Sequence, residues 1–117
     1  MSFKFEKLRV WEQAIDLTMN VNSLIKKFPS EEKYVLAQQM QRAADSVALN
    51  IAEGSTGQSN AEFKKFLGYS IRSGIEVVSC LYIGRKRRII NEYDFQTIYK
   101  LYDVLIMKLQ ALRNSIT

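Results

Sequence analysis

The sequence predicts an all-α protein, an antiparallel up-down-up-down four-helix bundle formed by a single domain over residues 1–117. The chain of 117 residues has only five glycines and one proline, so it has few of the residues that end the short strands of a β protein. Apolar residues make up 47% of the chain and recur at three- and four-residue steps in four segments. The linkers between these segments are short, which favours antiparallel neighbours.

The first helix is predicted from about Lys7 to Lys27. Its inner face consists of Val10, Ala14, Leu17, Val21, Leu24 and Phe28. A second apolar stripe, rotated by roughly a third of a turn, consists of Leu8, Trp11, Ile15 and Met19. One four-helix core rarely needs both faces, so this second stripe is predicted to be an oligomer interface or a contact with a partner protein.

The second helix is predicted to begin at Ser30, after the break at Pro29, with an acidic first turn. It continues to about Glu53 and is predicted to end at Gly54 in a left-handed cap. Its inner face consists of Leu36, Met40, Ala43, Val47 and Ile51.

Ser59 and Glu62 have the spacing of a capping box and predict the start of a third helix. Gly84 is predicted to mark fraying of that helix toward the basic run at residues 85–88. The inner face consists of Phe63, Phe66, Leu67, Ser70, Gly74, Val77, Val78 and Leu81. A fourth helix is predicted to begin within residues 91–94. Its apolar residues alternate at steps of four and three: Phe95, Ile98, Tyr102, Leu105, Leu109, Leu112 and Ile116.

The composition argues against several classes of function. The chain has no histidine, the commonest transition-metal ligand and the side chain most used for acid–base work near neutral pH. No catalytic residue, metal site or cofactor is therefore predicted. Cys80 is the only cysteine, so no disulfide within the chain is expected. No segment is apolar enough to span a membrane and no signal peptide is visible, which leads us to expect a cytoplasmic protein without membrane contact.

The net charge of +5 and the pI near 9.4 favour acidic partners such as RNA or DNA. The candidate nucleic-acid-binding residues are the densest basic run and three further cations on the same helix: Arg85, Lys86, Arg87, Arg88, Lys64, Lys65 and Arg72. The alternative is a solvated helix end whose cations complement the helix dipole. Exposed tyrosines in the second half of the chain offer stacking surfaces for bases, although packing at the core margin is the commoner fate of helical tyrosines.

A polar stripe accompanies the apolar face of the second helix. It consists of Arg42, Ser46, Asn50 and Glu53, and Glu76 of the third helix is expected to face it. Charges at the edge of a core need partners, so these five residues are predicted to form a structural hydrogen-bonded network or a subunit interface. They contain no nucleophile and base pair, which disfavours a catalytic role.

Several strings resemble a known family. Leu8 to Trp11, Phe28-Pro29, residues 39–54 and residues 62–67 resemble the bacterial four-helix-bundle proteins first noted as reading frames in intervening sequences of 23S ribosomal RNA. The distinctive string is Arg-x-x-x-Ser-x-x-x-Asn-Ile-Ala-Glu-Gly at residues 42–54. The residues that stand where the family pattern expects them are Trp11, Arg42, Ser46, Asn50, Glu53, Gly54, Glu62, Phe66, Ser73 and Glu76.

The resemblance implies an antiparallel four-helix bundle. Relatives that act as accessory proteins of diversity-generating retroelements form homopentamers and engage nucleic acid and a reverse transcriptase, while most members have no established biochemical role. This chain departs from the family at Arg72, where glycine is usual, and at Ser55 to Gln58, where a basic residue is frequent. A phosphate contact through that loop is therefore not expected.

Two hypotheses of function follow. The first is a non-catalytic homo-oligomer, a pentamer by resemblance, that binds RNA or DNA through a basic surface as an accessory factor, with a reverse transcriptase as a further partner. The alternative is a protein-interaction or scaffolding module that uses the second apolar stripe of the first helix and has no nucleic-acid role.

Overall fold

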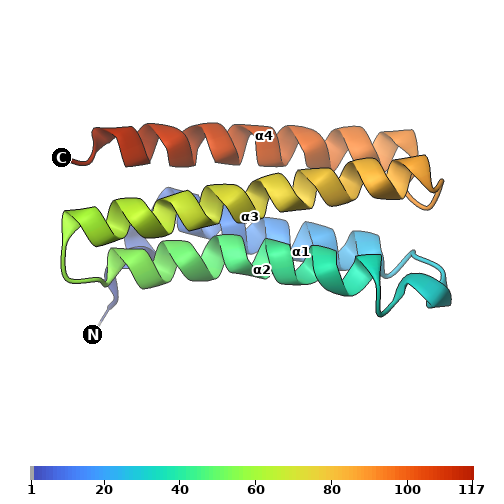
Figure 1. Cartoon of the computed structure of the whole chain (residues 1–117), viewed down its shortest axis with the longest axis horizontal. Helices are drawn as coiled ribbons and strands as arrows, with labels where there is room; N and C mark the ends of the chain where they lie inside the picture. The colour runs from blue at the N-terminus through green and yellow to red at the C-terminus, as the bar shows by residue number, and fades with distance from the viewer. Residues whose placement is uncertain (1) are drawn as a thin grey trace.

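The computed structural model describes residues 2–117, which form four α-helices that run alternately up and down one long axis (Figure 1). They are α1 (Arg9–Ile25), α2 (Leu36–Ser55), α3 (Asn60–Lys86) and α4 (Glu92–Ser115). Two short 3-10 helices, η1 (Lys4–Lys7) and η2 (Ser30–Glu32), precede α1 and α2. The bundle measures 43 × 25 × 19 Å. The predicted all-α up-down-up-down architecture is confirmed.

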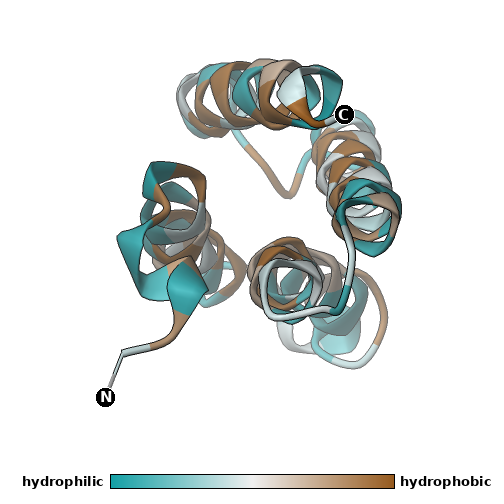
Figure 2. Ribbon diagram, turned by 90° about the vertical axis from the view of Figure 1, so that its left-hand side faces the viewer, coloured by the Kyte–Doolittle hydropathy of each residue, from teal (hydrophilic) through white to brown (hydrophobic). Residues whose placement is uncertain are grey.

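The helices surround one interior, with α1 also contacting α4 (Figure 2). The predicted inner faces supply the core, which includes Val21, Met40, Leu67 and Leu109, all fully buried. Cys80 packs in this core as a free thiol. The apolar periodicity of the sequence therefore identified the buried side of every helix.

The two ends of the bundle differ. The connections α1–α2 and α3–α4 lie together at one end, while the α2–α3 loop and the ends of the chain lie at the other (Figure 1). We call the first the basic end and define it as residues 26–35 and 85–91.

The predicted cap at Gly54 is wrong. Gly54 lies inside α2, which continues to Ser55, and no glycine within residues 2–117 has a positive φ. Its role is spatial, because a Cβ built on Gly54 would lie only 2.5 Å from the Cβ of Phe66 on α3. Farther along the same contact, the buried Ser70 hydroxyl donates a hydrogen bond of 2.9 Å to the carbonyl oxygen of Val47. Small residues thus let α2 and α3 approach closely.

The predicted fraying at Gly84 is also wrong. Gly84 is a buried helical residue, and α3 continues past it to Lys86. The side chain of Ile90 occupies the space that a Cβ at Gly84 would need. The Gly84 carbonyl oxygen accepts hydrogen bonds from the amides of Ile89 (2.9 Å) and Ile90 (3.2 Å). The glycine therefore allows the chain to fold back tightly onto the end of α3.

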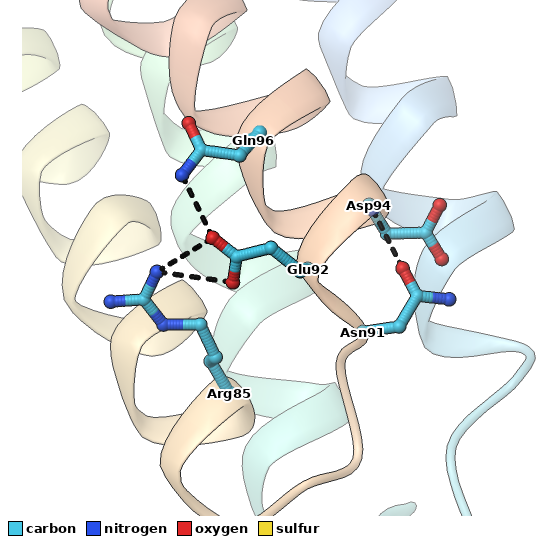
Figure 3. A network of polar contacts seen from close by, with 5 residues as sticks. All are labelled: Arg85, Asn91, Glu92, Asp94 and Gln96. Carbon is cyan, nitrogen blue, oxygen red and sulfur yellow. Dashed lines mark hydrogen bonds and ion pairs between the residues drawn. The ribbon is translucent and has the colours of Figure 1, made fainter.

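The helix starts follow the predictions in part. Ser59 Oγ accepts a hydrogen bond of 3.1 Å from the amide of Glu62 at the start of α3. At the start of α4, Asn91 Oδ1 accepts a hydrogen bond of 2.7 Å from the amide of Asp94 (Figure 3). The predicted start of the second helix at Ser30 is wrong. Residues 30–32 form only the η2 turn, and the backbone turns again at Val35 before α2 begins.

The α2–α3 contact yields a matched pair of glycine variants. Gly54→Ala should lower the free energy of unfolding by about 1–3 kcal/mol, because the new Cβ clashes with the rigid Cβ of Phe66. Gly68→Ala should raise it by about 0.5–1 kcal/mol, because the nearest atom to its Cβ lies 3.7 Å away and helical backbone favours alanine. Urea denaturation of both variants measures this. A Gly54→Ala protein as stable as Gly68→Ala would contradict the account of the contact.

Candidate nucleic-acid interface

The basic run begins on the last turn of α3. Arg87 caps the helix, and Arg88 adopts φ 64°, the only positive φ of a residue other than glycine within residues 2–117. This left-handed conformation follows many helix ends and is usually occupied by glycine, because a Cβ costs about 1–2 kcal/mol there. The sequence therefore has an arginine at a position where the backbone conformation favours glycine.

Arg85 is not a free cation. Its Nη1 lies 3.4 Å from both carboxylate oxygens of Glu92 at the start of α4 (Figure 3). Its guanidinium carbon also lies 3.8 Å from the ring centroid of Phe95, a cation–π geometry. A hydrogen bond from Gln96 and the charge of Arg85 together lower the pKa of the Glu92 carboxyl from its ordinary value. Arg85 therefore connects the last turn of α3 to the first turns of α4 through these contacts.

Arg87 is also paired. Its Nη1 lies 3.2 Å from the Glu32 carboxylate, which joins the end of α3 to η2. A further ion pair of 3.1 Å joins Lys27 to Asp94. Exposed pairs of this kind contribute little to stability, but they reduce the charge that each cation offers to a ligand. The exposed cations at the basic end without a carboxylate partner in the described chain are Lys26, Lys33, Lys86 and Arg88.

The other predicted cations lie elsewhere on α3. Lys64 and Lys65 are in its first turns, about 30 Å from Lys86 at 1.5 Å per residue. Arg72 is exposed and lies near the middle of α3. The seven predicted residues therefore do not form one cluster. Lys65, Arg72 and Lys86 instead share one stripe along the outside of α3, because positions seven apart differ by only about 20° in direction.

The predicted polar network does not form within one chain. Asn50 Nδ2 donates to the backbone oxygen of Ser46 (2.8 Å), and Glu76 accepts a hydrogen bond from Gln39 (3.2 Å). Within residues 2–117 this bond to the Ser46 backbone is the one side-chain hydrogen bond between two of the five predicted residues, and no hydrogen bond or ion pair joins two of their side chains. Arg42, Glu53 and Glu76 are exposed.

The reason lies in the buried face of α2, which is wider than predicted. Ala37, Ala44 and Ala48 extend it on the side opposite the polar stripe, and α2 is therefore rotated so that the stripe faces outward. The other hypothesis for these five residues, a subunit interface, stays a prediction.

The second stripe of α1 divides into two parts. Leu8 and Trp11 pack partly against the core, and the Trp11 ring centroid lies 4.8 Å from that of Phe5. Ile15 and Met19 remain exposed. More apolar surface is exposed on α4, where it consists of Tyr93, Leu101, Val104 and Met107. The oligomer interface at α1 stays a prediction.

A groove that the sequence did not predict runs between α1 and α2 toward the basic end. It has a volume of about 760 Å³, and its apolar lining includes Ile25, Phe28 and Leu49. Its polar lining includes a hydrogen-bonded chain. Asn22 Nδ2 donates to Gln41 Oε1 (3.2 Å), and Gln41 Nε2 donates to Asp45 Oδ1 (2.9 Å). We call this space the α1–α2 groove.

Tyr102 of α4 is fully buried in the core. Its hydroxyl is buried and has no hydrogen-bond partner in the described structure. Burial and, to a lesser degree, the charge of Asp45 raise the pKa of this hydroxyl above its ordinary value. Tyr102 is therefore a neutral core residue, and it is not available to stack on a base.

Two other kinds of feature are absent from residues 2–117. No helix is both long and apolar enough to cross a membrane. Within the same residues, no three acidic or cysteine side chains come together as a metal-binding group would.

The fold and the site define a four-helix bundle with a cation-rich end and a mixed apolar and polar groove beside it. The chain belongs to the 23S rRNA-intervening sequence protein family, whose sequence pattern matches residues 6–111. The resemblance seen in the sequence is thereby confirmed.

One solved relative shares the fold. It is a protein of unknown function from the S23 ribosomal protein family of Bacteroides thetaiotaomicron VPI-5482. The two chains are 20% identical with a TM-score of 0.84, and the match covers 91% of this chain and 99% of that one. No curated protein matches the sequence.

The backbone of Arg88 generates a stability prediction. Arg88→Gly should raise the free energy of unfolding by about 1 kcal/mol, because glycine adopts the left-handed conformation without strain. Lys86→Gly, two residues earlier in the helix, should lower it by about 0.5 kcal/mol. Thermal denaturation should show shifts of a few degrees in opposite directions. Destabilisation by Arg88→Gly would show that the arginine side chain is needed for the fold.

Proposed function

We propose that the protein is a non-catalytic accessory factor that binds RNA or DNA through its basic end. The observation that carries the proposal is the set of exposed cations without carboxylate partners there, Lys26, Lys33, Lys86 and Arg88, which come from both connections. Cations that are not neutralised within the protein are the ones that exchange for the counterions of a phosphate backbone. The net charge of +5 adds long-range attraction.

The paired cations support the proposal in a different way. Arg85 and Arg87 join α3 to α4 and to η2, so both connections are held in place. Lys86 and Arg88 alternate with these two residues in the sequence. The arginine at a position suited to glycine is consistent with selection for its charge, because strained residues are retained where function needs them.

Assembly is part of the proposal. The exposed apolar residues of α1 and α4 provide surface for a homo-oligomer, a pentamer by resemblance, that places several basic ends together. A cytoplasmic location and a reverse transcriptase partner belong to the same proposal. The exposed apolar surface also favours the second candidate, a protein-interaction module that does not bind nucleic acid.

The test compares two sets of glutamine variants that change the net charge equally. Glutamine at Lys26, Lys33, Lys86 and Arg88 should flatten the plot of log affinity against log salt by about 3, since each single-stranded phosphate contact contributes about 0.7. The control replaces Lys64, Lys65, Arg72 and Lys108, which lie outside the basic end, and should change the slope much less. Fluorescence anisotropy of labelled RNA measures both.

Two results would contradict the proposal. Equal flattening by both sets would mean that only net charge matters and the basic end is not a site. Absent or salt-independent binding at low ionic strength would leave the protein-interaction module as the better explanation.

A further inference from the structure

We propose that the α1–α2 groove receives an unpaired nucleotide of a single-stranded segment whose backbone is held by the basic end. The inference rests on the proposed function and adds a preference for single-stranded over duplex nucleic acid. The groove's volume of about 760 Å³ falls in the range of pockets that enclose small organic groups.

The groove offers aromatic and apolar surface to a base. Tyr34 lines the groove, and 77% of the surface of this residue is exposed. The sequence alone did not indicate Tyr34 as a binding residue. Phe28 and Leu49 provide further apolar lining. Stacking on aromatic rings is the main means by which proteins bind single-stranded nucleic acid, because every base has a π-face.

Positively charged side chains also line the α1–α2 groove. The Lys33 ammonium lies 5.5 Å from the Tyr34 ring centroid, and Lys26 also lines the groove. Arg42 lines it from α2, is exposed, and makes no ion pair within residues 2–117. A nucleotide whose base lies among the apolar residues would therefore have cations available for its phosphates. This charge distribution favours a nucleotide over an apolar helix, which would leave these cations without counter-charges.

The polar side of the groove is suited to a base edge. Asp45 uses one carboxylate oxygen to accept from Gln41, and Ser46 lines the groove one residue later. The hydrogen-bonded chain from Asn22 holds Gln41 and Asp45 in position. A base can reach such groups with its Watson–Crick edge only when it is unpaired. In a duplex, both that edge and the ring faces are occupied.

The groove continues directly into the basic end. Glu32, which pairs with Arg87 at 3.2 Å, immediately precedes Lys33 and Tyr34. Arg87, which makes this pair, stands between Lys86 and Arg88 in the sequence, so the ion pair brings the rim of the groove to the basic run. A strand bound to these two cations can therefore extend a nucleotide into the groove without a change in the protein.

The test uses two tyrosines with the same exposed fraction. Tyr34 lines the groove, whereas Tyr93 lies outside it on the first turn of α4, and each is 77% exposed. The probes are an unstructured uridine oligonucleotide and a blunt duplex with the same number of phosphates. Tyr34→Ala should weaken binding of the single strand by about 5- to 100-fold and that of the duplex by less than about two-fold, because only the single strand loses stacking. Tyr93→Ala should affect neither.

The outcomes separate this inference from the proposed function. If the glutamine variants of the basic end weaken binding but Tyr34→Ala does not discriminate between the probes, the inference fails and the proposed function stands. If the wild-type protein binds neither probe, both fail.

A protein occupant of the groove would also be detected. Leu49→Glu should weaken binding of the single strand, because it adds an anion to the groove, and should leave the particle mass in light scattering unchanged. A lower mass would mean that a second copy of the chain covers the groove, and this would overturn the inference.

Discussion

The close antiparallel contact between α2 and α3 determines the positions of the other features. It depends on Gly54, which admits Phe66, and on the buried hydrogen bond from Ser70 to the Val47 carbonyl. Toward the basic end, the same register brings Gln39 to Glu76 and then Glu32 to Arg87. Because α3 has 27 residues and α2 has 20, the end of α3 extends beyond α2 and reaches η2. The register of the α2–α3 contact therefore places the end of α3 beside η2.

This arrangement also determines how charge is divided. Arg85 and Arg87 are used to join the connections, and the neighbouring Lys86 and Arg88 are left for a ligand. The α1–α2 groove lies beside these cations, because η2 connects its rim to the end of α3. Under the proposed function, this end of the bundle combines cations for phosphates with a surface for an unpaired base.

Sequence periodicity predicted the four helices and most of the core, since burial repeats every three to four residues. It missed buried residues at the edges of the faces, such as Ala44 and Ala48. It did not predict the roles of Gly54 and Gly84, because each depends on a partner, Phe66 or Ile90, that only the tertiary fold brings close. The division of the basic run was missed for the same reason, because Glu32 is 55 residues from Arg87. Tyr34 was overlooked because it lies in a turn outside the apolar pattern. The resemblance predicted the family correctly.

Hydrogen–deuterium exchange with and without the uridine oligonucleotide tests the central claim most directly, because it distinguishes the two ends of one bundle. We expect slower exchange on binding in residues 26–41 and 83–91, which hold the connections and the rim of the α1–α2 groove. Residues 2–9 and 56–66 at the opposite end should be unchanged. Protection of that opposite end, with none at residues 26–41 and 83–91, would contradict the account.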